Sequence, residues 1–476
     1  NIDANNLFGN ALCYPLLIGD FKDLDKAAYS TIDWLHIDTK ADVGYFVVCD
    51  LHYPPSIHHA TQNLPLAPEL ADITYDDFSP YMKEMFVRRN LSRNPECKNP
   101  EKYNTVAKLL ATCRDKKEYV VHFLVLQLYL QLGMKISRIY RVIQFKQAPI
   151  FKDYIDFNTS RRSAAVNDFE KDMYKQKNCS LFGKSLENKR NRCDVVLCNS
   201  HNKMINAASD HRFKQARIFD ANFAAACLTK CNVELDSPIA IGASVLDISK
   251  YIMYKLAYIQ LPRYEKMFDC RIEIVGGDTD SFFIEVKGVD MISVLYPQMA
   301  ADGLLDTSNY PHTHSMFSNV HKAELDCIKD EFAGMPYKEF ILLRPKAYSM
   351  LPASGEVTAS KRKCKGIVKR KVKMFTHEDF KSTFLCQREV SAHCRRMQPK
   401  LHVVYNVNQY KIALSFSDDK RCWYSNNFSL PYGHVANDYY TVFPPDDEDI
   451  IHRTVQSNED IVDELFPPTA KHMKTK

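Results

Sequence analysis

Residues 276–286 read GGDTDSFFIEV and place two carboxylates, those of Asp278 and Asp280, one residue apart. The apolar residues 271–275 before them and the alternating pattern after them predict the two strands of a β-hairpin, with the aspartates at its turn. Like charges a few ångströms apart repel, so such a pair is usually held by a cation or has a raised pKa. The stretch therefore predicts a metal site, for which a third ligand must come from elsewhere in the chain.

The composition indicates a large folded chain. It has 476 residues, of which 45% are hydrophobic, enough for a sizeable core. Its longest apolar run, residues 120–132, is too short to span a bilayer and predicts a buried helix that ends at Gly133. The 15 cysteines form no CxxC pair, so we expect incidental thiols in a reducing compartment. The chain begins with Asn rather than Met, and we interpret it as a fragment.

Charge is unevenly distributed, although the net charge is only +5. Residues 361–373 (KRKCKGIVKRKVK) contain no acid and are a candidate contact for a polyanion. Residues 443–465 are rich in Asp and Glu and are expected to form a solvated tail. A basic run by itself does not identify nucleic acid as the partner.

Hydrophobic periodicity predicts mixed helices and strands. We expect strands at 43–53 and 135–145, and helices at 160–188 and 244–258. No regular βαβ repeat is present, which favours an α+β protein with inserted subdomains. The sequence has neither a GxGxxG nor a Walker-type loop, so phosphates must be bound in another way.

Two further features could complete a site around the aspartates. Asp3 follows an apolar residue and precedes a turn-forming pair of asparagines, so it could end a strand or be an ordinary exposed residue. If residues 160–188 form one helix, Lys171 and Lys175 are one turn apart, and Arg161 is rotated only about 40° from Lys175. These three side chains would then form one basic rail suited to a triphosphate.

Several motifs occur in an order typical of one enzyme family. Residues 3–9 (DANNLFG), 175–183 (KQKNCSLFG) and 276–281 (GGDTDS) are similar to motifs A, B and C of family B DNA polymerases. Further motifs of this family follow: LDTSNYP (305–311), KDE (329–331), LRPKAYS (343–349), DDKR (418–421) and YGH (432–434). The ordered set makes the chain resemble the protein-primed branch found in Maverick/Polinton transposons, related viruses and linear mitochondrial plasmids.

The resemblance implies an α+β right-hand polymerase fold with palm, fingers and thumb, two inserts and no exonuclease domain. The expected order is a first palm segment (1–52), first insert (53–112), fingers (113–189), second insert (190–233), a second palm segment (234–345), thumb and primer grip (346–442) and acidic tail (443–476). In relatives the first insert holds a priming protein and template. The second helps to encircle DNA and displace the strand ahead.

The resemblance also implies a reaction, the template-directed addition of deoxynucleotides to a 3′-hydroxyl, with two Mg²⁺ ions about 4 Å apart as cofactors. Asp3 and Asp280 would bridge the metals, and Asp278 would be a weaker or indirect ligand. The carbonyl of Ala4 would complete one coordination sphere.

Nucleotide-binding residues are implied by motifs A and B. Lys175 and Lys171 would bind the triphosphate, and Phe182 and Gly183 would lie near the nascent base pair. Phe8 stands where Tyr is usual and would exclude a 2′-hydroxyl, unless it only packs in the core. The remaining implied contacts are Leu7, Arg161 and Arg162, of which the arginines could instead be solvated charges.

DNA contacts would come from Lys346 and Tyr348, which match the KxY element that grips the primer terminus. The basic run would extend this grip through phosphate contacts made by Lys361, Arg362, Lys363 and Lys365. The implied partners are primer–template DNA, deoxynucleoside triphosphates and a terminal priming protein, with no membrane. We expect a monomer inside the cell, in a nucleus or viral replication site rather than an organelle.

Three residues depart from the family pattern: Cys179 in motif B, Gly276 in motif C and Phe8. Only two residues precede Asp3, so we expect its strand to be largely missing and the activity of this chain to be weakened, with no proofreading. Two other functions stay open. One is a catalytically incomplete remnant that only binds nucleic acid, and the other is a two-metal nuclease, which would not need Lys175 or the KxY element.

Overall fold

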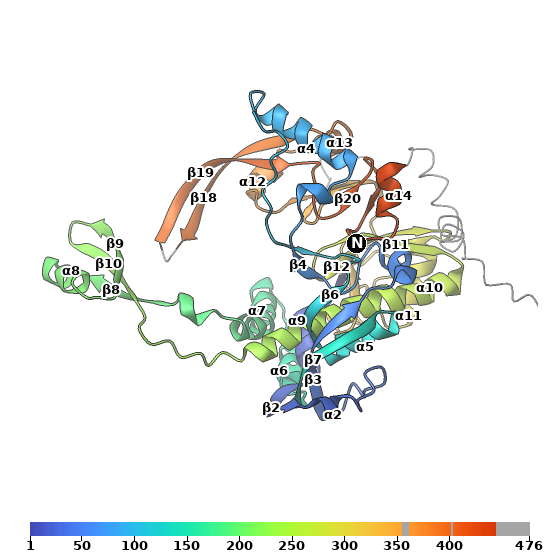
Figure 1. Cartoon of the computed structure of the whole chain (residues 1–476), viewed down its shortest axis with the longest axis horizontal. Coiled ribbons are helices and arrows are strands. Elements are labelled where there is room, and N and C mark those ends of the chain that lie inside the picture. The colour runs from blue at the N-terminus through green and yellow to red at the C-terminus, as the bar shows by residue number, and fades with distance from the viewer. Residues whose placement is uncertain (355–360, 401–402, 444–476) are drawn as a thin grey trace, which may run out of the picture.

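The structure is a computed structural model that describes residues 1–354, 361–400 and 403–443. It is an α+β protein built around a five-stranded sheet in the order β11-β12-β1-β14-β13 (Figure 1). The strands are β1 (Ile2–Ala4), β11 (Arg271–Gly277), β12 (Ser281–Lys287), β13 (Leu305–Asp306) and β14 (Ile328–Asp330). The predicted hairpin is confirmed as β11 and β12. The predicted acidic tail lies almost entirely outside the described residues.

Helices cover one face of this sheet: α9 (Ile239–Lys255), a π-helical turn (Leu256–Gln260), α10 (Leu261–Phe268) and α11 (Tyr296–Ala301). Ile2, Ala4, Phe282 and Ile284 point into this core, because alternate residues of a strand share a face. The predicted helix at 244–258 is confirmed. The opposite face carries Asp3 together with Phe283, which packs against Phe340 and Tyr348.

A second sheet has the order β2-β7-β3-β6. Its strands are β2 (Leu16–Leu24), β3 (Val43–His52), β6 (Lys116–His122) and β7 (Lys135–Ala148), and it packs on α5 (Phe123–Gln131). The strands predicted at 43–53 and 135–145 are confirmed. The helix predicted at 120–132 is shorter, because its first three residues pair with β3 instead. The sheet pairs two strands of the expected first palm segment, β2 and β3, with two strands of the expected fingers, β6 and β7.

The prediction of one helix over 160–188 is wrong. The structure has two helices that pack against each other, α6 (Lys152–Ala164) and α7 (Asp168–Ser185). The side chain of Asn167 accepts a hydrogen bond from the backbone N–H of Glu170 at 2.9 Å, which caps α7 and starts a new helix. Arg161 therefore lies on a different helix from Lys171 and Lys175, and the three do not form a rail along one helix.

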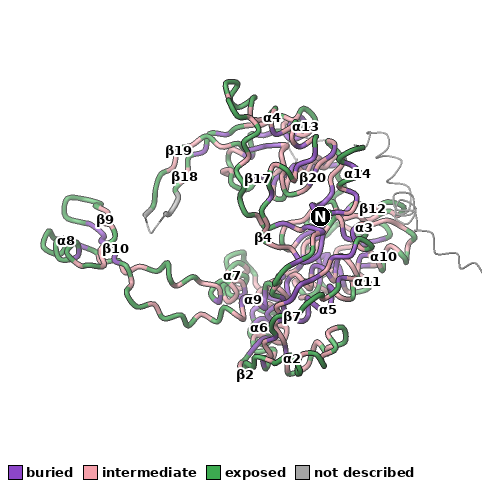
Figure 2. Tube along the Cα trace, in the orientation of Figure 1, coloured by how far each residue is buried: buried purple, intermediate pink, exposed green. Residues whose placement is uncertain are grey.

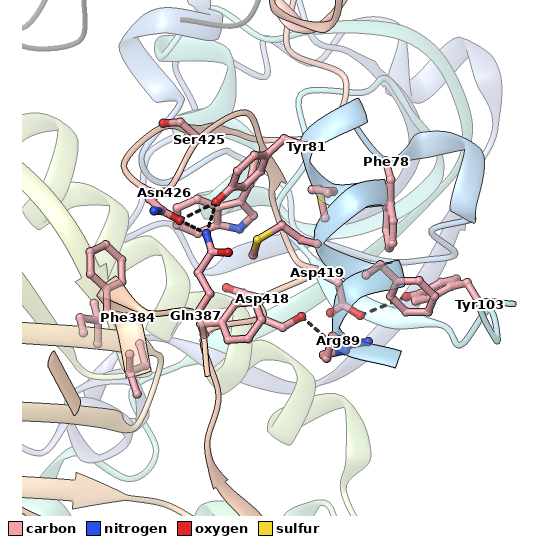
Figure 3. Close-up of a pocket in the computed structure, with 18 residues that line it drawn as sticks. Phe78, Tyr81, Arg89, Tyr103, Phe384, Gln387, Asp418, Asp419, Ser425 and Asn426 are labelled. Atoms are coloured by element: carbon pink, nitrogen blue, oxygen red, sulfur yellow. Dashed lines mark hydrogen bonds between the residues drawn. The ribbon is translucent and has the colours of Figure 1, made fainter. Parts of the chain in front are cut away.

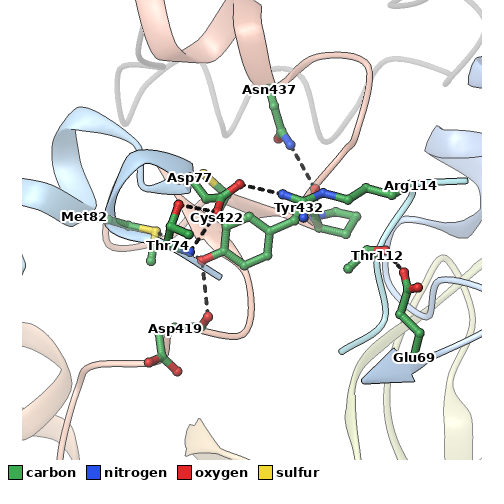
Figure 4. Close-up of polar contacts among 11 residues, drawn as sticks. Glu69, Thr74, Asp77, Met82, Thr112, Arg114, Asp419, Cys422, Tyr432 and Asn437 are labelled. Atoms are coloured by element: carbon green, nitrogen blue, oxygen red, sulfur yellow. Dashed lines mark hydrogen bonds and ion pairs between the residues drawn. The ribbon is translucent and has the colours of Figure 1, made fainter. Parts of the chain in front are cut away.

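The segment expected as the first insert packs against the C-terminal part of the chain. It contains α3 (His58–Thr61), β4 (Glu69–Ala71), α4 (Pro80–Arg93) and β5 (Lys108–Leu110), whereas the C-terminal part contains β20 (Cys422–Trp423), β21 (Ser429–Leu430) and α14 (Asn437–Val442). Arg114 pairs with Asp77 at 2.6 Å, and Tyr432 Oη donates to Asp419 O at 3.2 Å (Figure 4). The DDKR and YGH motifs therefore contribute to this packing.

An aromatic pocket lies where α4 meets residues 384–387 and 416–426 (Figure 3). Tyr81 Oη donates to Asn426 Oδ1 at 2.5 Å, and Gln387 Nε2 donates to Tyr81 Oη at 2.7 Å. Phe78 and Tyr103 line the opposite side of the pocket. Neither Asp3 nor the hairpin aspartates line it.

Two further units extend from this body. One is a three-stranded sheet of β15 (Tyr337–Arg344), β16 (Ala347–Pro352) and β17 (Lys361–Cys364), with α12 (Lys369–Val372), α13 (His377–Leu385) and the long hairpin of β18 (Val390–Lys400) and β19 (Val403–Leu414). The other is a small sheet of β8 (Cys193–Cys198), β9 (Phe213–Asp220) and β10 (Phe223–Thr229) with α8 (His201–Ala208).

The small β8–β10 unit stands apart from the body on two extended segments that are exposed or half-buried along most of their length (Figure 2). Arg217 on β9 donates to the carbonyl of Val404 on β19 at 2.8 Å, which links the unit to the long hairpin. Within the described ranges, no helix is both long and apolar enough to cross a membrane.

Candidate active site

β1 brings Asp3 to the hairpin that carries Asp278 and Asp280. Asp3 is paired in register with Ser281 on one side and with Lys329 on the other. The N–H of Ala4 donates to the carbonyl of Asp280 at 2.7 Å. The strand is short, but it is paired on both sides, contrary to the expectation that it would be largely missing. Because Ile2 and Ala4 face the core, Asp3 lies on the opposite face of the sheet.

The turn of the hairpin depends on its local sequence. The N–H of Asp278 donates to Ser281 O at 2.9 Å, and the N–H of Asp280 donates to Asp278 O at 2.7 Å. Thr279 has a φ of 64°, in the left-handed region. A Cβ on Gly277 would lie 2.9 Å from the carbonyl of Ser281, so this position requires glycine.

The electrostatics of the site favour a cation. Burial, followed by the charges of Asp280 and Glu331, raises the pKa of Asp3 to about 7. Burial and the charge of Asp278 also raise the pKa of Asp280. Partly desolvated carboxylates that repel one another are a donor set of hard oxygens, which fits Mg²⁺.

The third aspartate makes a different contact. Asp278 Oδ1 accepts from Lys346 Nζ at 2.6 Å. In the described part of the chain, the group of three metal-binding side chains whose ligand atoms all lie within 4.8 Å of one another does not include these aspartates. In this structure Asp278 is thus paired with a lysine, and the three carboxylates do not meet that distance criterion.

Lys346 and its neighbours form a basic wall beside the carboxylates. Lys346 lies at the turn between β15 and β16 with a φ of 66°. Tyr348 on β16 packs against Phe283 of the hairpin at 5.0 Å between ring centroids. Lys363 on β17 pairs in register with Tyr348, and its positive charge partly offsets the raised pKa of Asp3. The sequence motif KxY is thus adjacent to the hairpin aspartates.

The basic run on β17 divides between two faces. Lys361, Lys363 and Lys365 are exposed and alternate with residues that point the other way. Arg362 points away from them, and its Nη1 donates to Phe375 O at 2.7 Å. The structure therefore does not bring Arg362 together with the three lysines.

Helices α1 (Leu7–Cys13) and α7 bring motifs A and B together. The rings of Phe8 and Phe182 stack at 4.3 Å between centroids, with an angle of 9° between their planes. The positive charge of Lys175 on α7 partly offsets the raised pKa of both Asp3 and Asp280, so Lys175 lies within electrostatic reach of the two carboxylates.

The other residues predicted to contact the nucleotide lie in several different environments. The side chain of Leu7 is only 3% exposed and packs in the core, so only its backbone could reach a nucleotide. Lys171 pairs with Asp168 at 3.3 Å. Arg161 and Arg162 lie in the last turn of α6, and Gly183 is exposed on α7 with open space around it.

Sequence reasoning missed the role of Glu331. Its charge contributes to the raised pKa of Asp3 and of Tyr348, after burial in both cases. Its N–H donates to the carbonyl of Asn1 at 3.0 Å, beside β1. The KDE motif at 329–331 was the available signal, but no chemistry could be assigned to it without the pairing of β14 with β1.

No protein-family model matches the chain, and no curated protein is significantly similar to it in sequence. Among solved structures, phi29 DNA polymerase in an orthorhombic crystal form is similar, with a TM-score of 0.46 and 14% identity over 87% of this chain and 57% of the polymerase. The complex of phi29 DNA polymerase with primer-template DNA has a TM-score of 0.45 and 13% identity over 86% of this chain and 57% of that chain. The ternary complex with incoming nucleotide substrates also has a TM-score of 0.45 and 13% identity, over 87% and 57%.

The chain thus spans little more than half the length of these polymerase chains. A likeness at such TM-scores and identities does not establish a common fold or activity.

Proposed function

We propose that the chain is the polymerising portion of a template-directed DNA polymerase that adds deoxynucleotides to a 3′-hydroxyl. The observation that carries this proposal is the pairing of β1, which carries Asp3, with the hairpin that carries Asp280. The Phe8–Phe182 stack brings α7 to the same region, and the charge of Lys175 on α7 acts on both aspartates. A carboxylate pair with a facing lysine is a combination suited to phosphoryl transfer, because it can bind metal-bound triphosphate.

In this proposal Asp3 and Asp280 hold two Mg²⁺ ions, with Asp278 and the carbonyl of Ala4 as further ligands. When bound, the ions stabilise the attacking and leaving oxygens of the displacement. Lys175 neutralises charge on the triphosphate. Release of Asp278 from Lys346 would let it join the metal site.

The neighbouring residues support substrate selection. The stacked rings of Phe8 and Phe182 lie between motifs A and B, where a sugar and a base pair would be bounded by aromatic surfaces. Lys346, Tyr348, Lys363 and Lys365 would bind the primer strand through its phosphates, which carry no sequence information. The contacts predicted for Lys171, Arg161, Arg162 and Arg362 also belong to the proposal.

The palm, fingers, thumb and insert boundaries given above belong to the proposal, as do a monomeric state and a priming protein bound by residues 53–112. The packing of these residues on the C-terminal portion of the chain supports a docking platform on that side of the molecule. The Arg217–Val404 contact supports a closed path around bound DNA.

Primer extension on a labelled primer–template with Mg²⁺ tests the proposal. We expect extension by the chain, a loss of about a thousandfold in Asp280→Asn and of about a hundredfold in Lys175→Ala. Lys184→Ala is the matched control, because Lys184 lies on the same helix and pairs with Glu187 at 2.5 Å. Shortening of the primer instead would indicate a nuclease.

The Asp278–Lys346 ion pair favours a second candidate, a remnant that binds nucleic acid without catalysis. The same assay separates the two. A folded chain that binds primer–template DNA with the same affinity as Asp280→Asn, and that extends no primer in either form, would support the remnant and reject the polymerase.

A further inference from the structure

A long connection leads from β13 to β14 and carries a cluster of three metal-binding side chains. Residues 307–327 form turns but no helix or strand, and connections of this length without secondary structure are uncommon in compact domains. Within the described residues, ligand atoms of His321, Glu324 and Cys327 all lie within 4.8 Å of one another. This cluster is separate from the aspartates of the candidate active site.

The three side chains offer one nitrogen, one oxygen and one sulfur. His321 Nδ1 lies 2.6 Å from Glu324 Oε2. The thiol of Cys327 is 3% exposed and donates to the carbonyl of Gly303 at 3.2 Å. His321 also lies against Gly303, since a Cβ built there would be 3.5 Å from its Cε1. The cluster therefore has a buried inner wall and an exposed outer side.

This donor set has a preferred metal. Thiolate and imidazole ligands together select zinc over Mg²⁺ or Ca²⁺, and a carboxylate oxygen is a common third ligand. Three protein ligands leave the fourth tetrahedral position to water, which the exposed side of the cluster would admit. Successive ligands are three positions apart in the sequence, and turns rather than a helix bring them together.

The cluster is hydrogen-bonded to the segment that follows Asp3. The N–H of Asn5 donates to Cys327 O at 2.9 Å, and Asn5 Nδ2 donates to Glu324 O at 3.0 Å. Asn10 Nδ2 donates to Asp326 Oδ1 at 2.7 Å. Cys327 directly precedes β14, which pairs with β1. Through these hydrogen bonds, fixing the position of residues 321–327 also restrains the backbone that carries Asp3.

We propose that His321, Glu324 and Cys327 bind a zinc ion that secures residues 307–327 and, through Asn5 and β14, the position of β1. Binding forms one bond from each ligand to the ion and releases the thiol proton of Cys327 to solvent. The role proposed for the ion is to secure this connection, and it does not depend on the function proposed for the aspartates.

Cobalt substitution tests the site in the full chain. The chelator-treated protein is titrated with Co²⁺, which reports tetrahedral thiolate coordination by visible and near-ultraviolet absorption. We expect one equivalent of Co²⁺ to produce a visible band from tetrahedral coordination and a near-ultraviolet band from the bond between sulfur and the metal. Cys327→Ser should lose the near-ultraviolet band. Cys386→Ser, which changes an exposed cysteine outside the cluster, should keep it. Absence of the bands in the unchanged chain, or their persistence in Cys327→Ser, would overturn the proposal.

Zinc-dependent stability gives a second readout that does not require activity. One equivalent of Zn²⁺ should raise the unfolding midpoint of the unchanged chain by about 2–5 °C. Glu324→Gln and His321→Ala should lower that shift, and each should still fold because both side chains are at least partly exposed. An equal shift in all three proteins would place the zinc elsewhere and reject the site, whatever the result of primer extension.

Discussion

Asp3, for which we propose a role in metal binding, also lowers the free energy of unfolding when its carboxylate is charged. Its pKa is about 7 in the folded chain, against an ordinary value of 3.8. Between these pH values the folded state binds more protons than the unfolded state, so the free energy of unfolding falls as the pH rises through this window. Above about pH 7 the carboxylate is charged in both states, and the full cost remains.

Asp3→Asn should therefore stabilise the protein in EDTA by about 1–2 kcal/mol at pH 8, after allowance for the partial exposure of the site. At pH 4 the substitution should have almost no effect, because Asp3 is then largely neutral in the folded state. Urea unfolding at the two pH values measures the difference. The same stabilisation at both values would contradict the raised pKa.

Lys346 offers a separate residue-scale prediction because its φ is 66°. Lys346→Ala and Lys346→Gly remove the same charge, but only glycine adopts this backbone conformation without a steric cost. We expect the glycine variant to be more stable than the alanine variant by about 1 kcal/mol. Thermal unfolding of the two variants measures this difference.

Both Lys346 variants should weaken DNA binding equally and reduce the slope of log affinity against log salt by about one. Lys26→Ala, on the short helix α2 (Lys26–Tyr29), is the control that should leave the slope unchanged. Unequal slopes for the glycine and alanine variants would mean that backbone strain, rather than charge, affects DNA binding.

At the scale of elements, α7 has few fully buried residues, so we expect its stability to depend on its cap. Only Asn178 and Ser185 are buried along its 18 residues, so little apolar burial stabilises the helix. This dependence matters because α7 carries both Lys175 and Phe182.

Asn167→Ala should cost about 1 kcal/mol of stability and raise the KM for deoxynucleotides more than it lowers kcat. Asn167→Ser retains a capping oxygen and should behave like the unchanged chain. Circular dichroism and steady-state extension measure the two effects. If the variant loses stability while its KM stays constant, the position of Lys175 does not depend on the cap at the start of α7.

At the scale of the whole molecule, the β8–β10 unit forms a core of its own. Cys198, Ala207, Ala224 and Ala226 are buried within it. Cys193 and Thr229 are partners in the β8–β10 pairing, so the two chain segments enter and leave side by side. The unit can therefore be removed without separating the ends of the remaining chain.

Replacing residues 193–229 by about four Gly and Ser residues should leave the unfolding midpoint of the body within about 2 °C. Addition of a single nucleotide should be retained, whereas long products and synthesis through duplex DNA should be lost. Product lengths on a primed single strand and on a gapped duplex measure this. Loss of single-nucleotide addition in a folded variant would show that the unit also supports the active site.

Features that depend on short-range patterns could be predicted from the sequence. Alternating apolar residues predicted the hairpin and the strands at 43–53 and 135–145, because strand periodicity is local. The motif GGDTDS predicted a tight turn carrying two acids, and the structure agrees: Gly277 leaves room for the carbonyl of Ser281, and Thr279 adopts a left-handed φ.

Contacts between distant groups were settled by the tertiary fold instead. The Asp278–Lys346 ion pair, the Phe8–Phe182 stack and the effect of Glu331 on Asp3 all join segments that are far apart in sequence. The division of 160–188 into two helices is different, because the Asn167 cap that starts α7 is a local signal, which the prediction of one continuous helix left out. Contacts between distant segments are not encoded by local patterns, because strand pairing and side-chain packing are chosen by the fold as a whole.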